Sequence, residues 1–300
     1  MKNTLFYKYV KIINPARLQS SLLKLSKSLN LRGKLLITEE GINGCVSGSA
    51  ANITKFQKAL TKDKRFQDML FKDTGAATHT FDKMFVRVRK EIITSHFPSS
   101  MHDAAPYVEP KELKAWLDKK DNLLMVDARN DYESKIGKFH NALTPNLKTF
   151  RDWPNVVRQI PDKKQKIVTY CTGGIRCEKA SAYLRKKGYK NVYQLHGGIL
   201  QYGRECGNAY WEGKCFVFDQ RGAVDIDPEN QSKPITICIY CRSPCAKYHN
   251  CALESCDKRF IACPECAQQF DNCCSKKCRN KKSACYSPFA RRTNQLSIFV

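Results

Sequence analysis

Eleven of the sixteen cysteines of this 300-residue chain lie in one short stretch, from Cys238 to Cys285. Such a stretch lacks a hydrophobic core of its own, so bound metal or disulfides must hold it together. The N-terminus shows no apolar run of the kind found in signal peptides, and we expect a cytoplasmic protein. Because the cytoplasm keeps thiols reduced, the cluster predicts metal sites.

The spacing of these cysteines suits zinc. Two Cys-x2-Cys pairs and further cysteines supply enough thiolates for two tetrahedral sites of four sulfurs each. The spacing leaves the pairing open, because ten candidates exceed eight ligands and Cys245 and Cys273 remain alternatives. We expect two structural zinc ions, held by Cys238, Cys241, Cys251, Cys256, Cys263, Cys266, Cys274 and Cys278.

The charge of the chain points to a polyanionic partner. Lys and Arg number 52 against 28 Asp and Glu, which gives a net charge of +24. Nucleic acid is the first candidate and an acidic membrane surface the second, while a merely basic enzyme is the alternative. No segment approaches the roughly 20 apolar residues of a membrane span, so we expect no membrane partner. Nine Lys or Arg between Lys258 and Arg292 predict phosphate contacts, unless they form a solvated basic face.

Residues 1–95 predict an α+β domain of the ferredoxin-like type. Hydrophobic periodicity gives strands and helices in the order βαββαβ, which is the order of such domains. The expected strands are 4–10, 33–38, a strand through Cys45 and Val46, and 84–89; the helices are 15–29 and 51–61, with a tight turn at 41–44. Residues 96–108 have the composition of a linker.

Residues 109–220 predict an α/β domain with a parallel sheet. Short buried strands at 123–126, 165–170 and 191–195 alternate with helices at 109–120 and 177–187, as a parallel sheet requires. Residues 221–300 then form the cysteine-rich, basic module.

The α/β domain contains a stretch suited to a reactive thiolate. Strand 165–170 ends in Cys171, and Thr-Gly-Gly-Ile-Arg176 leads into the next helix. Ligand sites in open α/β sheets lie at such strand ends. Gly173 and Gly174 let the loop N–H groups converge at the positive end of the helix, so we expect Cys171 to be ionised at neutral pH. Arg176 adds a permanent positive charge.

Alternatives exist for this loop. Cys171 could be an ordinary buried cysteine in a Gly-rich turn. A cysteine phosphatase loop has the spacing Cys-x5-Arg, and this loop is one residue shorter, which is too tight for a phosphoryl group. Cys177 either resolves a persulfide or sulfenate on Cys171 or packs at the start of the helix.

The loop resembles the active loop of the rhodanese family. Two further stretches support the resemblance: Val126-Asp-Ala-Arg129 with Tyr132-Glu133 after it, and Leu195-His-Gly-Gly198. The family's Gly-His-Ile order is disturbed in Ile136-Gly-Lys-Phe-His-Asn-Ala142. The resemblance implies that Asp127 and Arg129 form a pair near the active loop and belong to the catalytic site.

The whole chain resembles the rhodanese-related tRNA uridine hydroxylase family. The resemblance rests on Thr38-Glu-Glu-Gly-Ile-Asn-Gly44, Phe85-Val-Arg-Val-Arg-Lys-Glu-Ile92, the Cys171 loop and the cysteine-rich end. It implies oxygen-dependent conversion of the wobble uridine 34 to 5-hydroxyuridine, with the anticodon loop of tRNA as partner and molecular oxygen as co-substrate. The sequence shows no dinucleotide fingerprint, no His-rich iron triad and no obvious flavin site, and it does not indicate the electron donor.

These residues allow a mechanism and two rival functions. Addition of the Cys171 thiolate to C6 of uracil would make C5 nucleophilic, and Arg176 with the loop N–H groups would stabilise the enolate oxygen. One rival is a sulfurtransferase that carries a persulfide on Cys171, and the other is a non-catalytic RNA-binding protein. RNA would also contact the N-terminal domain through Arg87, Arg89 and Lys90, with Phe6, Tyr7 or Phe85 as stacking rings.

Overall fold

The computed structural model describes residues 1–97, 101–160, 162–227, 229–256 and 258–284. The chain divides into two compact units, Met1–Lys233 and Pro234–Val300. Among the described residues, no helix combines the length and the apolar character needed to cross a bilayer.

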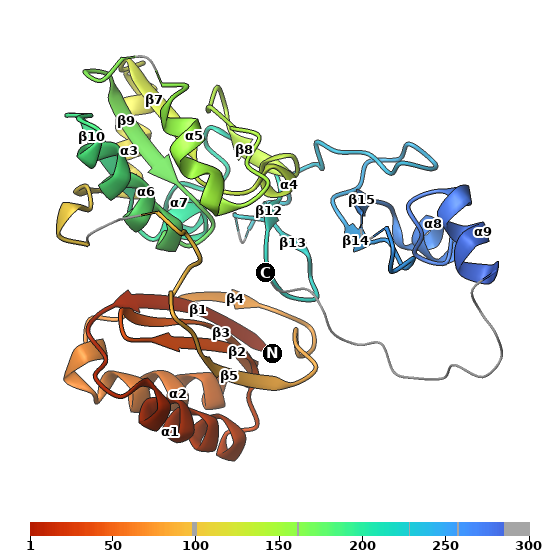
Figure 1. Cartoon of the computed structure of the whole chain (residues 1–300), viewed down its shortest axis with the longest axis horizontal. Helices are drawn as coiled ribbons and strands as arrows, with labels where there is room; N and C mark the ends of the chain where they lie inside the picture. Colours follow the sequence, from red (N-terminus) through yellow and green to blue (C-terminus); the bar gives the residue numbers. More distant parts are fainter. Residues whose placement is uncertain (98–100, 161, 228, 257, 285–300) are drawn as a thin grey trace. The chain divides into compact units, whose positions relative to one another are not determined.

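The first unit begins with a five-stranded sheet in the order β4-β1-β3-β2-β5. Helices α1 and α2 cover one face of this sheet (Figure 1), and a buried cluster that includes Phe6, Leu35 and Phe56 fills the space between them. The elements are β1 (Lys2–Tyr9), α1 (Pro15–Ser28), β2 (Arg32–Thr38), β3 (Gly41–Gly48), α2 (Ala50–Thr61), β4 (Lys72–Gly75) and β5 (Met84–Val88).

The ferredoxin-like order is confirmed, with a different last strand. β4 lies antiparallel beside β1 and completes the βαββαβ order, whereas β5 is an additional strand parallel to β2. The short polar sequence of β4, Lys-Asp-Thr-Gly, gives no periodic pattern. The expected tight turn at 41–44 is wrong: the turn falls on Glu39 and Glu40, and β3 begins at Gly41 because its backbone pairs with both β1 and β2.

The second domain of this unit contains the expected parallel sheet, in the order β6-β10-β9-β7. β6 lies within the stretch expected as a linker, and it joins the sheet edge beside β10. The elements are β6 (Tyr107–Val108), α3 (Pro110–Asp118), β7 (Leu123–Asp127), α4 (Asp131–Ser134), β8 (Gly137–Phe139), α5 (Trp153–Val157), β9 (Lys166–Tyr170), α6 (Ile175–Lys186), β10 (Val192–Leu195) and α7 (Gly198–Cys206). Two short antiparallel pairs follow, β11 (Trp211–Gly213) with β8, and β12 (Cys215–Phe216) with β13 (Ala223–Val224).

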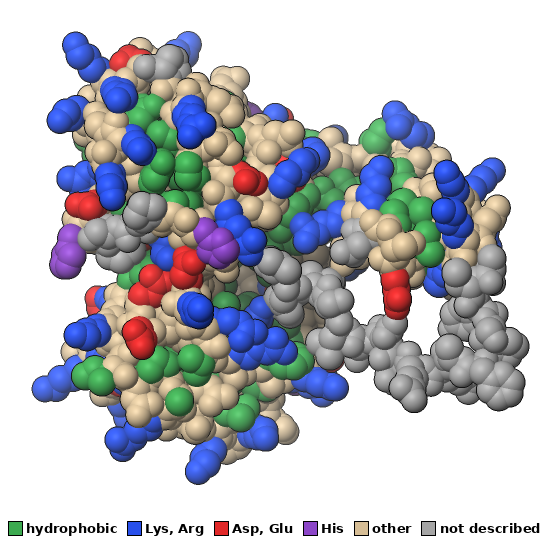
Figure 2. Space-filling view, in the orientation of Figure 1, with side chains coloured by type: hydrophobic (Ala, Val, Ile, Leu, Met, Phe, Trp, Pro, Cys, Tyr) green, Lys and Arg blue, Asp and Glu red, His purple; other side chains and the backbone are tan. Residues whose placement is uncertain are grey.

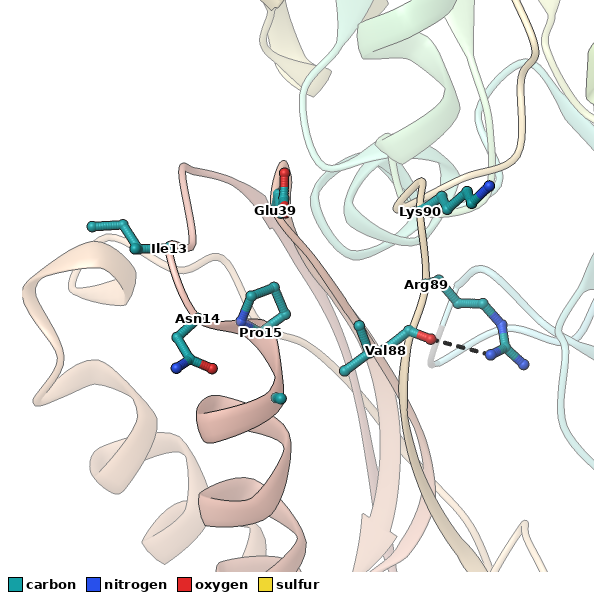
Figure 3. Close-up of a pocket in the computed structure, with 8 residues that line it drawn as sticks. Ile13, Asn14, Pro15, Glu39, Val88, Arg89 and Lys90 are labelled. Atoms are coloured by element: carbon teal, nitrogen blue, oxygen red, sulfur yellow. Dashed lines mark hydrogen bonds between the residues drawn. The ribbon is translucent and has the colours of Figure 1, made fainter.

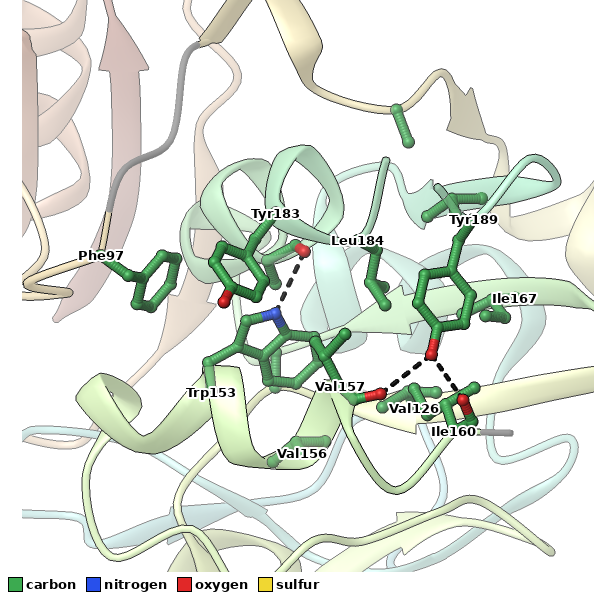
Figure 4. Packing of buried hydrophobic residues seen from close by; sticks show 14 of the residues in the cluster. Phe97, Val126, Trp153, Val156, Val157, Ile160, Ile167, Tyr183, Leu184 and Tyr189 are labelled. Atoms are coloured by element: carbon green, nitrogen blue, oxygen red, sulfur yellow. Dashed lines mark hydrogen bonds between the residues drawn. The ribbon is translucent and has the colours of Figure 1, made fainter. Parts of the chain in front are cut away.

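Helix α6 is fixed by its burial. All residues from Arg176 to Leu184 are buried. Trp153 is fully buried beside the helix, and its indole N–H donates to the carbonyl of Ala180 at 3.1 Å. Tyr183 and Leu184 pack in the same cluster (Figure 4). The start of α6, and the loop that precedes it, are therefore held firmly in place.

The second unit is small and consists of a hairpin and two short helices. The hairpin pairs β14 (Tyr248–Asn250) with β15 (Arg259–Ile261), and α8 (Pro264–Gln269) and α9 (Lys276–Ala284) follow. Its buried cluster consists largely of cysteines, with Phe260 as the one large aromatic residue among the buried members. The rings of Tyr240 and Phe270 stack at 3.7 Å between centroids. So small an apolar core agrees with a fold that depends on its cysteines.

Candidate active site

Cys171 lies directly after β9, a central strand of the parallel sheet, and directly before α6. The Gly174 N–H donates to the Cys171 sulfur at 3.1 Å, and Gly174 has a φ of +100°, which favours glycine. Gly198 lies under the loop, where an added Cβ would come within 2.5 Å of the Cys171 carbonyl oxygen. The strand, loop and helix therefore form the expected cradle around the sulfur.

The electrostatics of the cradle favour a thiolate. Burial by itself would raise the pKa of the fully buried Cys171. A hydrogen bond from Cys177, the positive charge of Arg176 and the N–H groups of Arg176 and Gly174 outweigh it and lower the Cys171 pKa to about 5. Cys171 is therefore the one group of the loop prepared to act as a nucleophile at neutral pH.

Cys177 occupies the first turn of α6, and its side chain hydrogen-bonds to Cys171. Burial and the neighbouring Cys171 sulfur raise the pKa of Cys177 well above its usual value. The structure thus brings together one thiolate and one protonated thiol, as resolving chemistry needs.

Arg176 forms a buried ion pair with a carboxylate. Its two terminal nitrogens donate to the two carboxylate oxygens of Glu133 at 2.6 and 2.8 Å, and both side chains are buried. Glu133 follows Tyr132 in the sequence, and its local pattern does not indicate this role. Because the guanidinium fork is occupied, the geometry does not favour Arg176 as the donor to a substrate oxyanion, although its charge still acts on Cys171.

Asp127 and Arg129 form a second buried ion pair. The Arg129 Nη2 atom lies 2.6 Å from Asp127 Oδ2, and neither side chain is exposed. Arg129 also donates to the Gly137 carbonyl, and its guanidinium lies 5.4 Å from the Trp211 ring centroid. Among the described contacts, none joins either residue to the Cys171 sulfur. The Asp127–Arg129 pair connects the end of β7 to the start of β8. The resemblance to the rhodanese family implied that this pair lies near the active loop.

The sheet of the N-terminal domain closes the site. A Cβ added at Gly173 would lie 2.9 Å from Leu5, and one at Gly174 would lie 2.8 Å from the Tyr7 hydroxyl. The Tyr7 hydroxyl donates to Glu178 of α6 at 3.0 Å. Sequence reasoning missed this contact, because no local pattern shows which face of β1 meets another domain.

Further polar contacts join the two domains along α6. Lys179 is buried and pairs with Glu40 at 3.0 Å and with Glu91 at 3.1 Å. Glu178 also accepts hydrogen bonds from Tyr107 and Gln194. The first two turns of α6 therefore carry both the reactive loop and the contacts that attach the N-terminal domain to it.

Of the residues expected to contact RNA in the N-terminal domain, Arg87 lies 5.2 Å from the Phe85 ring centroid, and the other four fall into two groups. Phe6 is fully buried and Tyr7 is engaged by Glu178, so neither offers a free ring. Arg89 and Lys90 line an open hollow between β5 and the start of α1, where the Arg89 guanidinium donates to the Val88 carbonyl (Figure 3). This hollow contains none of the residues around Cys171.

The cysteine-rich unit contains two groups of four cysteines. In each group the four sulfurs all lie within 4.8 Å of one another. Pairs such as Cys241 and Cys263 lie 3.7 Å apart, close to the roughly 3.8 Å between sulfurs of a tetrahedral site with Zn–S bonds of about 2.3 Å. The groups are Cys238, Cys241, Cys263 and Cys266, and Cys251, Cys256, Cys274 and Cys278.

These groups contain the eight cysteines expected from the sequence, and they resolve the pairing that spacing left open. The neighbouring cysteines Cys238 and Cys241 share a group with Cys263 and Cys266, and Cys251 and Cys256 share one with Cys274 and Cys278. The two sites therefore cross along the chain. Four-sulfur sites of this size can hold metal ions and are compatible with zinc. Cys245 and Cys273 belong to neither group, while Cys285, Arg291 and Arg292 lie outside the described residues.

Comparisons with known proteins place the chain in a family. Family models match the UPF0176 acylphosphatase-like domain over residues 1–92, the rhodanese-like domain over 109–205 and the rhodanase C-terminal domain over 212–279. A tRNA uridine(34) hydroxylase of Bacillus licheniformis is 40% identical over 284 residues, which cover 92% of this chain and 87% of that protein. The chain belongs to the tRNA uridine(34) hydroxylase family.

A second relative and a solved structure are also similar to the chain. A second tRNA uridine(34) hydroxylase, from Bacillus velezensis, is 40% identical and covers 94% of this chain and 89% of its own. The solved rhodanese-like domain of an Anabaena protein is 21% identical over 36% of this chain and 79% of its own, with a TM-score of 0.32. The family resemblance and the fold class expected from the sequence are confirmed.

The low pKa of Cys171 predicts a thiolate that survives in mildly acidic solution. At neutral pH the ultraviolet absorbance of the natural chain should exceed that of Cys171→Ser by the absorbance of one thiolate. This difference should vanish as pH falls through about 5. Cys215→Ser is a matched control, because burial raises the Cys215 pKa to about 12 and its thiol absorbs little at neutral pH. A difference that appears only above about pH 8 would contradict the cradle described here.

The crossed cysteine groups predict two zinc ions per purified chain. Cys266→Ser should remove one ion in elemental analysis and expose the other three cysteines of its group to alkylation. Cys245→Ser and Cys273→Ser are matched controls that should leave the metal content unchanged. Loss of zinc from either control, or no zinc in the natural chain, would show that the pairing is wrong.

Proposed function

We propose that this protein hydroxylates C5 of uridine 34 in tRNA, with Cys171 as the catalytic nucleophile. The observation that carries the proposal is the buried Cys171 thiolate, cradled by N–H groups in a chain whose relatives are tRNA uridine(34) hydroxylases. The same observation argues against a purely RNA-binding role, because a binding protein gains nothing from an ionised buried sulfur.

The substrate in this proposal is the anticodon loop, whose base at position 34 is unstacked at little cost. The net charge of +24 favours phosphate contacts, and Figure 2 shows Lys and Arg side chains over the visible face of the molecule. The cysteine-rich unit itself contains described basic residues that would add phosphate contacts, among them Lys258, Arg259, Lys276, Lys277, Arg279, Lys281 and Lys282. We place the reaction in the cytoplasm, where tRNA is found.

The chemistry begins with addition of the Cys171 sulfur to C6. The new S–C6 bond breaks the C5–C6 double bond, and the electron pair moves toward C5 and the C4 oxygen. Molecular oxygen then bonds to C5, and two thiol equivalents reduce the peroxide, which gives the C5 hydroxyl, water and a disulfide. Loss of the C5 proton and of the Cys171 thiolate restores the ring as 5-hydroxyuridine.

The other site residues support this step. Cys177 supplies one of the two thiol equivalents that reduce the peroxide, since it is held as a protonated thiol against the reacting sulfur, and a small-molecule thiol supplies the other. The ion pair with Glu133 keeps the Arg176 guanidinium beside the Cys171 loop. The Asp127–Arg129 pair positions the strand ends around the loop. Two zinc ions in the crossed cysteine groups would hold the C-terminal unit together, with no part in the reaction.

The proposal predicts a specific loss of nucleosides. In cells lacking this protein, nucleoside mass spectrometry of tRNA should show no 5-hydroxyuridine, and the natural chain should restore it. Cys171→Ser should not restore it, whereas Cys206→Ser, which alters a half-buried cysteine at the end of α7, should. Unchanged 5-hydroxyuridine with loss of a thiolated nucleoside would instead identify a sulfur carrier.

A further inference from the structure

One buried cation of the first unit forms no direct ion pair with a carboxylate. Among the residues that the structure describes, the buried basic side chains are Lys72, Arg129, Arg176 and Lys179. The last three each pair with carboxylates, as described above. For Lys72, no carboxylate of the described chain lies within ion-pairing distance, and its ammonium makes no hydrogen bond to any described residue.

Lys72 points into the space above the Cys171 loop. It begins β4, where its backbone pairs with Leu5 of β1. A Cβ added at Gly173 would lie 3.9 Å from the Lys72 side chain, and the ammonium lies 4.7 Å from the Tyr7 ring centroid. The Cys171 sulfur and Glu178 are the anions close enough to act on its charge.

An ammonium in this position is costly to maintain. A lysine normally extends its charge into water, and burial without an anion is unfavourable. Lys72 is only 1% exposed, so its stem does not carry the charge to the surface. The negative charge of the Cys171 thiolate offsets part of this cost, and when that sulfur adds to a bound group the charge moves onto that group.

We propose that Lys72 is a catalytic residue, whose ammonium donates a hydrogen bond to the C4 oxygen of uracil as that oxygen gains charge during addition of Cys171. The inference rests on the proposed function and adds to it a residue from the N-terminal domain. It fills the role that Arg176 leaves open, because the Arg176 fork is occupied by Glu133. No proton transfer is needed, since the ammonium stabilises the enolate electrostatically.

The charge on Lys72 gives this role a pH dependence. Burial lowers the Lys72 pKa, Cys171 and Glu178 oppose this change, and the Arg204 charge adds to it; the pKa that results is about 8. Tyr7, the remaining neighbour, has a pKa raised well above its usual value and stays neutral. Lys72 is therefore charged at neutral pH, and activity should fall as pH rises through about 8, where Cys171 remains ionised.

The test uses the purified full-length chain, unmodified tRNA, oxygen and dithiothreitol, with 5-hydroxyuridine measured by mass spectrometry. Lys72→Met should lower kcat at neutral pH by about 100- to 1,000-fold with little change in KM. Lys72→Arg should keep much more activity and should lose the fall near pH 8, because a guanidinium stays charged. Lys58→Met, on the exposed side of α2, is the matched control and should behave like the natural chain.

The outcomes separate this inference from the proposed function. If the natural chain forms no 5-hydroxyuridine, the proposed function fails and the inference fails with it. If the natural chain is active and Lys72→Met keeps its kcat within about threefold, Lys72 has no catalytic role. If Lys72→Met does not fold, Lys72→Arg decides: an unchanged fall near pH 8 overturns the inference, and its loss supports it.

Discussion

A buried, negatively charged sulfur is the constraint on which the rest of this structure depends. A charge without water is stable only if hydrogen bonds and opposite charges replace the solvent. Around Cys171 these come from N–H groups of the loop, from Cys177 and from the charge of Arg176. Glycine at position 174, the buried start of α6 and the Arg176–Glu133 pair all serve to keep these groups in place.

The same constraint explains why two domains meet at the loop. The rhodanese-like domain builds the cradle, and the acylphosphatase-like domain excludes water from above it through Leu5, Tyr7 and Lys72. Because Cys171 has no exposed surface, groups around the loop must move before a base can reach the sulfur.

The sequence revealed those parts of the site that follow one another along the chain. The strand, Cys171, the two glycines and the helix are adjacent, so local rules predicted the cradle and the ionised thiol. The eight cysteines in the two groups were also identified from spacing, but their crossed pairing depends on how the C-terminal unit folds.

Contacts between domains could not be predicted in the same way. Lys72 begins a four-residue polar strand that shows no periodicity, and the sequence does not show which face of β1 carries Phe6 and which carries Tyr7. Likewise, the sequence shows Arg176 beside the loop but gives no sign of its partner, and only the fold shows that it forms an ion pair with Glu133.

The most direct test of this account is covalent capture of the base by Cys171. An anticodon stem-loop with 5-fluorouridine at position 34 cannot lose a proton from C5, so the sulfur–C6 adduct should persist. Mass spectrometry of the digested complex should find the modified base on the Cys171 peptide in the natural chain and no adduct in Cys171→Ser. An adduct on another cysteine, or none in a chain that forms 5-hydroxyuridine from ordinary tRNA, would contradict the account.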